Sequence, residues 1–116
     1  MLHKKYRLQS YLIPEVIKKG KRFHSQLFDL IKSKQPPSNS LQQSCFAFIV
    51  SKKFDKRAVR RNKFKRWMRE AVRADLIKIK KGYNIVLIAH QCGRRNNFIQ
   101  IKIELRKALN KGELLK

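Results

Sequence analysis

The chain has few acidic residues. Only seven Asp and Glu stand against 30 Lys and Arg in 116 residues, which gives a formal net charge of +23. The acids are widely spaced along the chain, whereas a protein nuclease usually needs clustered carboxylates to hold metal ions or a positioned base. A compact fold with this much charge repels itself, and polyanions relieve that repulsion. Nucleic acid is therefore the leading partner, and an anionic membrane surface is the second possibility.

Cysteine, histidine and long apolar runs are also scarce. Cys45 and Cys92 lie far apart and fit neither a disulfide framework nor a metal-binding pattern. His3, His24 and His90 belong to no motif, so no protein-bound metal site is expected. No stretch approaches the roughly 20 apolar residues of a membrane span, and the N-terminus lacks the apolar core of a signal peptide. These absences favour a reduced, cytoplasmic protein of one domain, residues 1–116.

The apolar residues that are present predict the order helix, strand, strand, helix, strand, helix. The expected ranges are 13–19 (helix), 28–32 (strand), 45–51 (strand), a helix from about 58 to 73, 83–90 (strand) and 97–111 (helix). A break is expected at residues 35–40, "QPPSNS". Segment 45–51 has apolar residues on both faces, which suggests a central strand. Segment 97–111 also alternates like a strand, but its length, Asn96 or Asn97 as a cap and Gly112 at the end favour a helix.

The segment "RRNKFKRWMREAVR", residues 60–73, carries seven cationic side chains and one acid. On a helix, one side holds Phe64, Trp67, Met68 and Ala71, which we expect to pack on the sheet. The opposite side holds Asn62, Lys65, Arg66, Arg69 and Arg73. Like charges at i,i+4 cost a few tenths of a kcal/mol per pair, so this helix is most stable with an anionic ligand. Asp55, just before the segment, is expected to cap the helix.

The residues around this helix resemble the bacterial ribonuclease P protein family. That family carries an Arg-Asn-Arg-x-x-Lys-Arg helix after a strand that ends in Ser-Lys-Lys. The matching residues here are Ser51, Lys52, Lys53, Arg61, Asn62, Lys63, Lys65, Arg66 and Arg69. Lys63 stands where the family has arginine. The resemblance is strong over about a quarter of the chain and weaker elsewhere.

The resemblance implies a fold and an activity. The fold would be α/β, a single-domain two-layer sandwich of αβββαβα order with a left-handed crossover around the basic helix, like ribosomal protein S5 domain 2. The activity would be that of ribonuclease P, an endoribonuclease in which a catalytic RNA removes the 5′ leader of precursor tRNA. Mg²⁺ would be bound mainly by the RNA and the substrate. The chain would then be a cytoplasmic RNA-binding subunit with no catalytic residue of its own, and with no membrane or DNA partner.

The resemblance also implies two binding surfaces. The surface for the catalytic RNA comprises Lys52, Lys53, Arg60, Arg61, Asn62, Lys63, Lys65, Arg66, Arg69 and Arg73. A cleft between the first helix and the sheet would hold the precursor's 5′ leader, partly through aromatic residues. Aligning Gly20 with the family puts Ile13, Ile17 and Ile31 at the cleft positions, and isoleucine lacks the π face on which a base stacks. Leader contacts are then weaker, or they come from Tyr11, Phe46, Phe48 or nearby lysines.

Two other functions fit the composition. A structural ribosomal protein is equally basic, but the long basic tails and Gly-rich extensions typical of that class are missing here. A DNA-binding regulator would read bases with the same helix and recognise paired half-sites as a dimer. The sequence shows no heptads for such a dimer.

Overall fold

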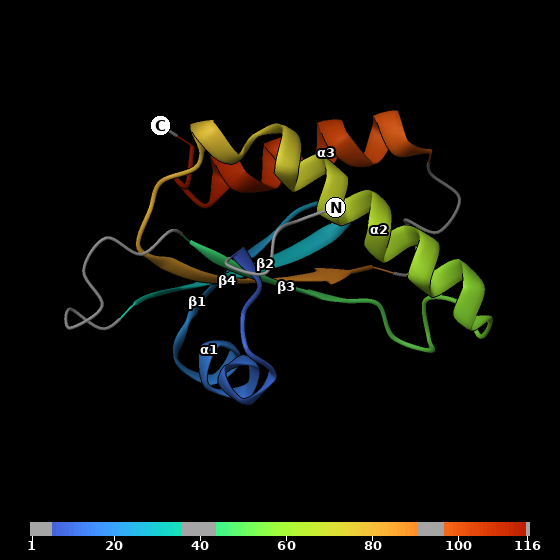
Figure 1. Ribbon diagram of the computed structural model, residues 1–116, viewed down its shortest axis with the longest axis horizontal. Coiled ribbons are helices and arrows are strands. Elements are labelled where there is room, and N and C mark those ends of the chain that lie inside the picture. Colours follow the sequence, from blue (N-terminus) through green and yellow to red (C-terminus); the bar gives the residue numbers. More distant parts are fainter. Residues whose placement is uncertain (1–5, 36–43, 91–96, 116) are drawn as a thin grey trace.

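Four strands form one mixed sheet with helices on both faces (Figure 1). The structure is a computed structural model that describes residues 6–35, 44–90 and 97–115. Its elements are α1 (Ile13–Lys19), β1 (Lys21–His24), β2 (Phe28–Lys34), β3 (Cys45–Ile49), α2 (Ala58–Ala74), β4 (Tyr83–Ala89) and α3 (Phe98–Lys111). This is the αβββαβα order that the family resemblance implies. Most of the expected break, together with Cys92 and His3, lies outside the described residues.

The strands lie in the order β1-β2-β4-β3. β1 and β4 both pair antiparallel with β2, whereas β3 and β4 are parallel neighbours. Since α2 connects β3 to β4, these two strands and the helix form a crossover unit, as expected. The left hand of this crossover, which the family resemblance implies, stays a prediction. Right-handed crossovers are the general rule in proteins, so a left-handed connection here would be a rare one.

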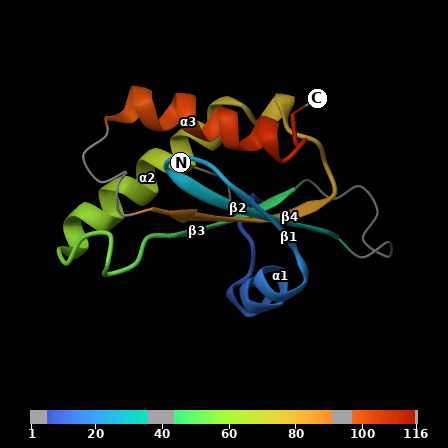
Figure 2. The same ribbon diagram turned by 180° about the vertical axis from the view of Figure 1, so that it is seen from behind.

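The helices divide unequally between the two faces of the sheet. α2 and α3 lie side by side on one face, and α1 lies alone on the other (Figures 1 and 2). The larger core fills the space under α2 and α3 and includes Phe28, Leu30, Phe46, Phe64, Met68, Ile85, Leu87, Ile101, Leu105 and Leu109. The smaller core, under α1, consists of Leu8, Val16, Ile31, Ala47 and Val86. The sheet and the α2/α3 pair thus make the expected two-layer sandwich, to which α1 is added.

Strand β3 alternates as expected but is not central. Phe46 belongs to the larger core and Ala47 to the smaller one, so successive side chains face opposite layers. Yet β3 pairs only with β4 among the strands, and its other side meets Arg7 and Leu8, whose N–H donates to the Phe46 carbonyl at 2.8 Å. The prediction of a central position was wrong. The apolar character on both faces arises because helices cover both sides of the sheet.

The other boundaries differ from the sequence predictions at a few places. Periodicity alone missed β1, since its four residues are mostly exposed and strongly basic. The helix chosen over a strand near the C-terminus is confirmed as α3, which Asn97 and Gln100 begin with reciprocal side-chain to backbone hydrogen bonds of 2.9 and 3.1 Å. Asp75, at the end of α2, accepts two hydrogen bonds from Arg106 of α3, at 2.9 and 3.3 Å. This pair fixes one helix against the other.

Candidate nucleic-acid interface

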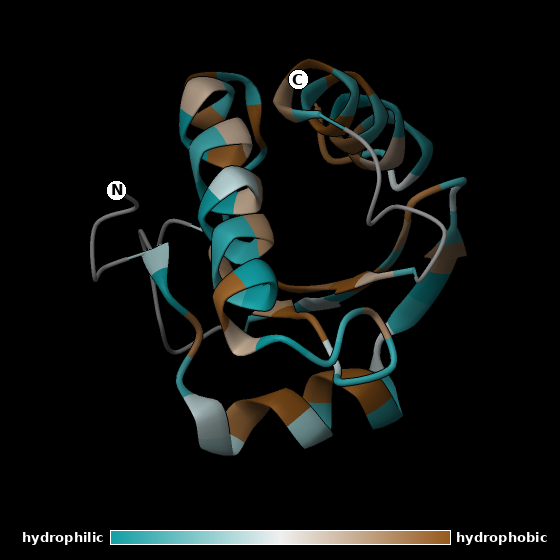
Figure 3. Ribbon diagram, turned by 90° about the vertical axis from the view of Figure 1, so that its right-hand side faces the viewer, coloured by the Kyte–Doolittle hydropathy of each residue, from teal (hydrophilic) through white to brown (hydrophobic). Residues whose placement is uncertain are grey.

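Helix α2 presents a cationic side to solvent. Phe64, Met68, Ala71 and Val72 are buried beneath it, and Asn62, Arg66 and Arg73 are exposed on the opposite side. Lys65 and Arg69 lie between these positions and are half-buried. The division expected from helical periodicity is therefore confirmed, and the outward side of α2 is mostly hydrophilic (Figure 3).

Aromatic packing holds α2 on the sheet. The Phe64 ring lies 4.5 Å from the Phe54 ring and 6.2 Å from the Phe28 ring, measured between centroids. Phe54 closes the turn after β3, because its N–H donates to the Ser51 carbonyl at 3.0 Å. Lys52 and Lys53, the exposed residues within that turn, are thereby held next to the beginning of α2. Both side chains lie in the turn that leads from β3 to α2.

The beginning of α2 is organised by Asp55 and Arg61. The Arg61 guanidinium donates to the carbonyl oxygens of Asp55 and Lys56, at 3.0 and 2.9 Å, so this side chain is partly engaged within the protein. The Asp55 carboxylate accepts from the Arg57 N–H at 2.9 Å and lies 3.6 and 3.9 Å from the guanidinium groups of Arg57 and Arg60. That backbone hydrogen bond, helped by the two arginines, holds the pKa of Asp55 below its usual value against the opposing effect of burial.

Asp55 is therefore not the cap that the sequence suggested. The residue at the cap position is Arg57, and no side chain accepts a hydrogen bond there. Asp55 lies two residues earlier and orders the turn leading into α2.

Two further side chains expected at the interface also have partners within the helix. The Lys63 ammonium lies 5.0 Å above the centre of the Trp67 ring, and Arg73 lies 3.4 Å from Glu70. Trp67 itself is half-buried against the larger core, close to its expected role.

The face of the sheet that carries α1 is apolar. Val16 of α1 packs on Ile31, Ala47 and Val86, and Gly20 ends the helix at a point of close approach. A Cβ atom at Gly20 would lie 2.5 Å from the Val16 carbonyl oxygen and 2.7 Å from the Ile31 side chain, so any larger residue forces these neighbours to shift. Beside α1, the half-buried residues Ile49 and Ile88 are direct neighbours on β3 and β4.

Comparison with known proteins identifies the family. A family model described as ribonuclease P matches residues 2–113. The chain belongs to the ribonuclease P protein family. The ribonuclease P protein component of Thermotoga maritima is 40% identical over 73 residues. Those residues are 63% of this chain but 58% of that protein, so the match spans less than two thirds of that relative's length. The component of Clostridium kluyveri is 32% identical, and the match covers 87% of this chain and 88% of that protein.

The fold agrees with solved ribonuclease P proteins. The structure of a Staphylococcus aureus RNase P protein mutant, described as defective in mRNA degradation activity, superposes with a TM-score of 0.86. It is 26% identical in sequence, and the superposition covers 97% of this chain and 92% of that one. The α+β sandwich predicted from the family resemblance is thereby confirmed.

The residues that the ribonuclease P family resemblance placed at a leader cleft do not all lie on one face. Ile13 and Ile17 are on α1, with Ile17 36% exposed, and Ile31 lies beneath that helix with no exposed surface. Tyr11 precedes α1 and is 73% exposed. Phe46 and Phe48 project toward α2 and α3, because residues at even positions of β3 face the larger core. They therefore lie away from the α1 face, and the sequence prediction that grouped them with it was wrong about their direction.

Ile49 and Ile88 lie on the α1 face, and sequence reasoning did not assign them to the leader cleft. Both belong to strands that were predicted, and apolar residues were expected on both faces of segment 45–51. What was missing was the pairing of β3 with β4, which sets these two side chains next to each other.

Among helices in the described residues, none is long and apolar enough to cross a membrane.

Proposed function

We propose that this chain is the protein subunit of ribonuclease P and that α2 is its docking surface for the catalytic RNA. The observation that carries the proposal is the outward side of α2, where Asn62, Lys65, Arg66, Arg69 and Arg73 follow one another on a helix with a single acidic residue. Arginine guanidinium groups recognise phosphate oxygens through paired donors, and Asn62 offers both a donor and an acceptor to a base edge or a 2′-hydroxyl. Lys52, Lys53, Arg60, Arg61 and Lys63 extend this surface.

The chemistry of cleavage is assigned to the RNA and not to this chain. Three buried carboxylates of the described residues are already engaged with basic groups: Asp29 with Arg22, His24 and His90, Asp55 with Arg57 and Arg60, and Asp75 with Arg106. Mg²⁺ prefers oxygen ligands, and these acids offer no cluster of free oxygens. The ion is therefore assigned to the RNA and the substrate. The protein's contribution is to neutralise phosphate repulsion and hold the precursor.

The 5′ leader of precursor tRNA is assigned to the α1 face. Ile13, Ile49 and Ile88 are partly exposed apolar residues packed against the smaller core under α1, and Ile17 is an exposed apolar residue of the same helix. Such side chains contact a base or a ribose but cannot stack on it. Stacking of a base on an aromatic side chain commonly contributes about 1–3 kcal/mol per base. Lysines around α1, including Lys18, Lys19 and Lys21, supply charge for the leader phosphates. Leader binding should thus depend more on charge and less on stacking than in relatives with aromatic residues there.

A cleavage assay tests this function. Precursor tRNA is incubated with the cognate ribonuclease P RNA at low Mg²⁺, with and without the purified full-length chain. We expect the protein to raise the rate at which the 5′ leader is released, since its charge replaces part of the screening that Mg²⁺ provides. A short polylysine of equal charge concentration is the control for non-specific screening. If the protein stimulates no more than polylysine does, or if it copurifies with ribosomal subunits instead of one catalytic RNA, the proposal is wrong.

A further inference from the structure

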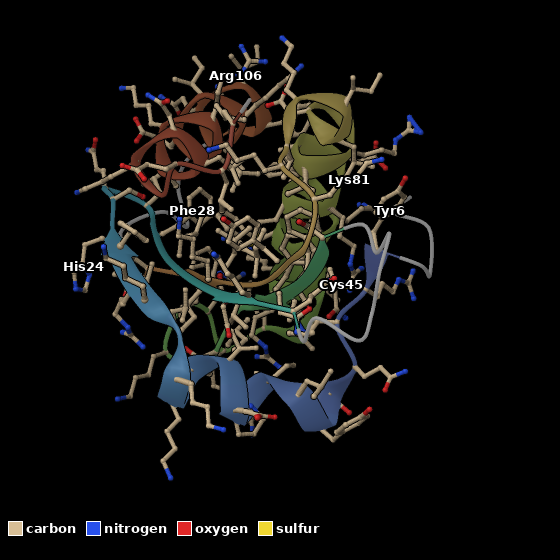
Figure 4. All side chains as sticks on the ribbon, turned by 90° about the vertical axis from the view of Figure 1, so that its left-hand side faces the viewer. Tyr6, His24, Phe28, Cys45, Lys81 and Arg106 are labelled. Atoms are coloured by element: carbon tan, nitrogen blue, oxygen red, sulfur yellow. The ribbon has the colours of Figure 1, made fainter. Side chains whose placement is uncertain are left out.

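Three potential metal ligands meet at the end of the sheet where β1 and β4 end and β2 begins. His24 is the last residue of β1, Asp29 is the second residue of β2, and His90 directly follows β4. His24 and Asp29 are paired in the β1–β2 register, and the His90 N–H donates to the Leu27 carbonyl at 2.8 Å. Backbone pairing thus fixes all three residues. Figure 4 shows His24 at the outer edge of the sheet, on β1.

The side chains of these residues converge on one oxygen. Nδ1 of His24 lies 2.6 Å and Nε2 of His90 lies 2.7 Å from the same atom, Oδ1 of Asp29. The three ligand atoms all lie within 4.8 Å of one another. The other carboxylate oxygen, Oδ2, accepts from the Arg22 guanidinium at 3.0 Å. The carboxylate is therefore held in place from one side by Arg22 and offers its second oxygen to both imidazoles.

We propose that His24, Asp29 and His90 form a binding site for one divalent transition-metal ion of the Zn²⁺ type. Two imidazole nitrogens and one carboxylate oxygen are a donor set that suits Zn²⁺, with a water molecule completing four-fold coordination. The same nitrogens suit Co²⁺ and Ni²⁺ and disfavour Mg²⁺, which prefers oxygen. The proposal does not rest on the docking of RNA to α2. Asp29 is the register partner of Ile88, one of the residues assigned to the 5′ leader, so the site borders the α1 face.

The ion can reach the site with small side-chain movements. In tetrahedral coordination the ligand atoms lie roughly 3.3 Å apart, so each histidine–Asp29 separation must open by about 0.6–0.7 Å. The side chain of His24 is 69% exposed and that of His90 is 35% exposed, whereas Asp29 is 8% exposed. The two histidines can therefore turn while the carboxylate stays fixed. Each imidazole moves its proton to the nitrogen facing away from the ion, which at His24 is open to water.

Nearby cations limit the affinity. Arg22 shares the Asp29 carboxylate, and the Lys111 ammonium of α3 donates to the His24 carbonyl oxygen at 2.5 Å. Both positive charges oppose a further cation at this end of the sheet and therefore lower the affinity for the ion. A bound ion would link the ends of β1, β2 and β4.

The test is a titration of the full-length chain with Co²⁺ and then Zn²⁺ near neutral pH. The wild type is compared with His24→Gln and His90→Gln, and with His3→Gln as a variant that loses a histidine outside the cluster. We expect one ion per chain, visible absorption bands typical of tetrahedral Co²⁺, and displacement of Co²⁺ by Zn²⁺ but not by about a hundredfold excess of Mg²⁺. Each cluster variant should lose about 10-fold or more in affinity, the loss that even an outer-shell change commonly causes.

Folding of the variants is checked by circular dichroism, and His24→Gln is the safer one because that side chain is largely exposed. Zn²⁺ should also raise the melting temperature of the wild type and of His3→Gln but not of the two cluster variants, since an ion that binds only the folded state stabilises it. The proposal is overturned if the wild type binds Co²⁺ no more tightly than folded His24→Gln does. In that case the three residues are an ion-paired cluster and nothing more.

Discussion

Removing three charges from the outward side of α2 should weaken RNA binding in a way that depends on salt. The proposed variant combines Lys65→Gln, Arg66→Gln and Arg69→Gln. These side chains follow one another on the helix and are exposed or half-buried, so their loss leaves the core under α2 intact. Removing the repulsion between Lys65 and Arg69 should stabilise the helix by a few tenths of a kcal/mol. The melting temperature should therefore stay the same or rise slightly.

The size of the effect follows from counterion release. Each phosphate contact contributes about 0.7–0.9 to the slope of log K against log salt, so three lost contacts should reduce that slope by about 2–3. If the binding curves of wild type and variant converge near 1 M salt, the variant binds roughly 100- to 500-fold more weakly near 0.1 M. That difference corresponds to about 3–4 kcal/mol.

The assay is a filter-binding or fluorescence titration of the cognate catalytic RNA over a range of salt concentrations. The matched control replaces three exposed lysines spread over other elements, Lys34→Gln, Lys78→Gln and Lys107→Gln, and has the same net charge. We expect the control to change the slope by less than about one unit, since its lysines contribute only to the general field of the protein. Equal slopes for the two triple variants would refute a docking surface on α2 and leave net charge as the only determinant.

Two further outcomes test the structure itself. Gly20→Ala should lower the free energy of unfolding by about 1–3 kcal/mol, because the added methyl group overlaps the Val16 carbonyl and the Ile31 side chain; urea denaturation measures this, and an unchanged midpoint would contradict the close approach. Burial raises the pKa of Asp29, but its hydrogen bonds with the two histidines outweigh this and hold the pKa below 3.8. Because the pKa of Asp29 is lower in the folded than in the unfolded protein, its ionised carboxylate stabilises the fold at any pH above the pKa of the unfolded state. This contribution is lost as the pH falls through the pKa of the folded state. When the pH is lowered from about 5 to about 2 in the presence of a chelator, the free energy of unfolding should therefore fall less for Asp29→Asn than for the wild type. Equal losses for the two proteins would show that the pairing of Asp29 with the histidines does not stabilise the fold.

Much of the interface was readable from the sequence because it depends on a single helix. Residues on one helix keep fixed angular positions whatever surrounds them, so the separation of Phe64 and Met68 from Arg66 and Arg69 follows from spacing alone. The same holds for the capping residues of α3, where Asn97 and Gln100 are three positions apart. Strand β3 was predicted from the sequence, with apolar residues on both of its faces.

What the sequence by itself determined about this protein is therefore local: a very basic chain, an amphipathic helix with one cationic side, and a motif shared with ribonuclease P proteins. The tertiary structure decided which distant residues meet. It put β3 at the edge of the sheet, turned Phe46 away from α1, set Ile49 beside Ile88, and brought His24, Asp29 and His90 to one oxygen. The physical reason is that strand order and register depend on pairings between segments far apart in the chain, and no local spacing encodes them.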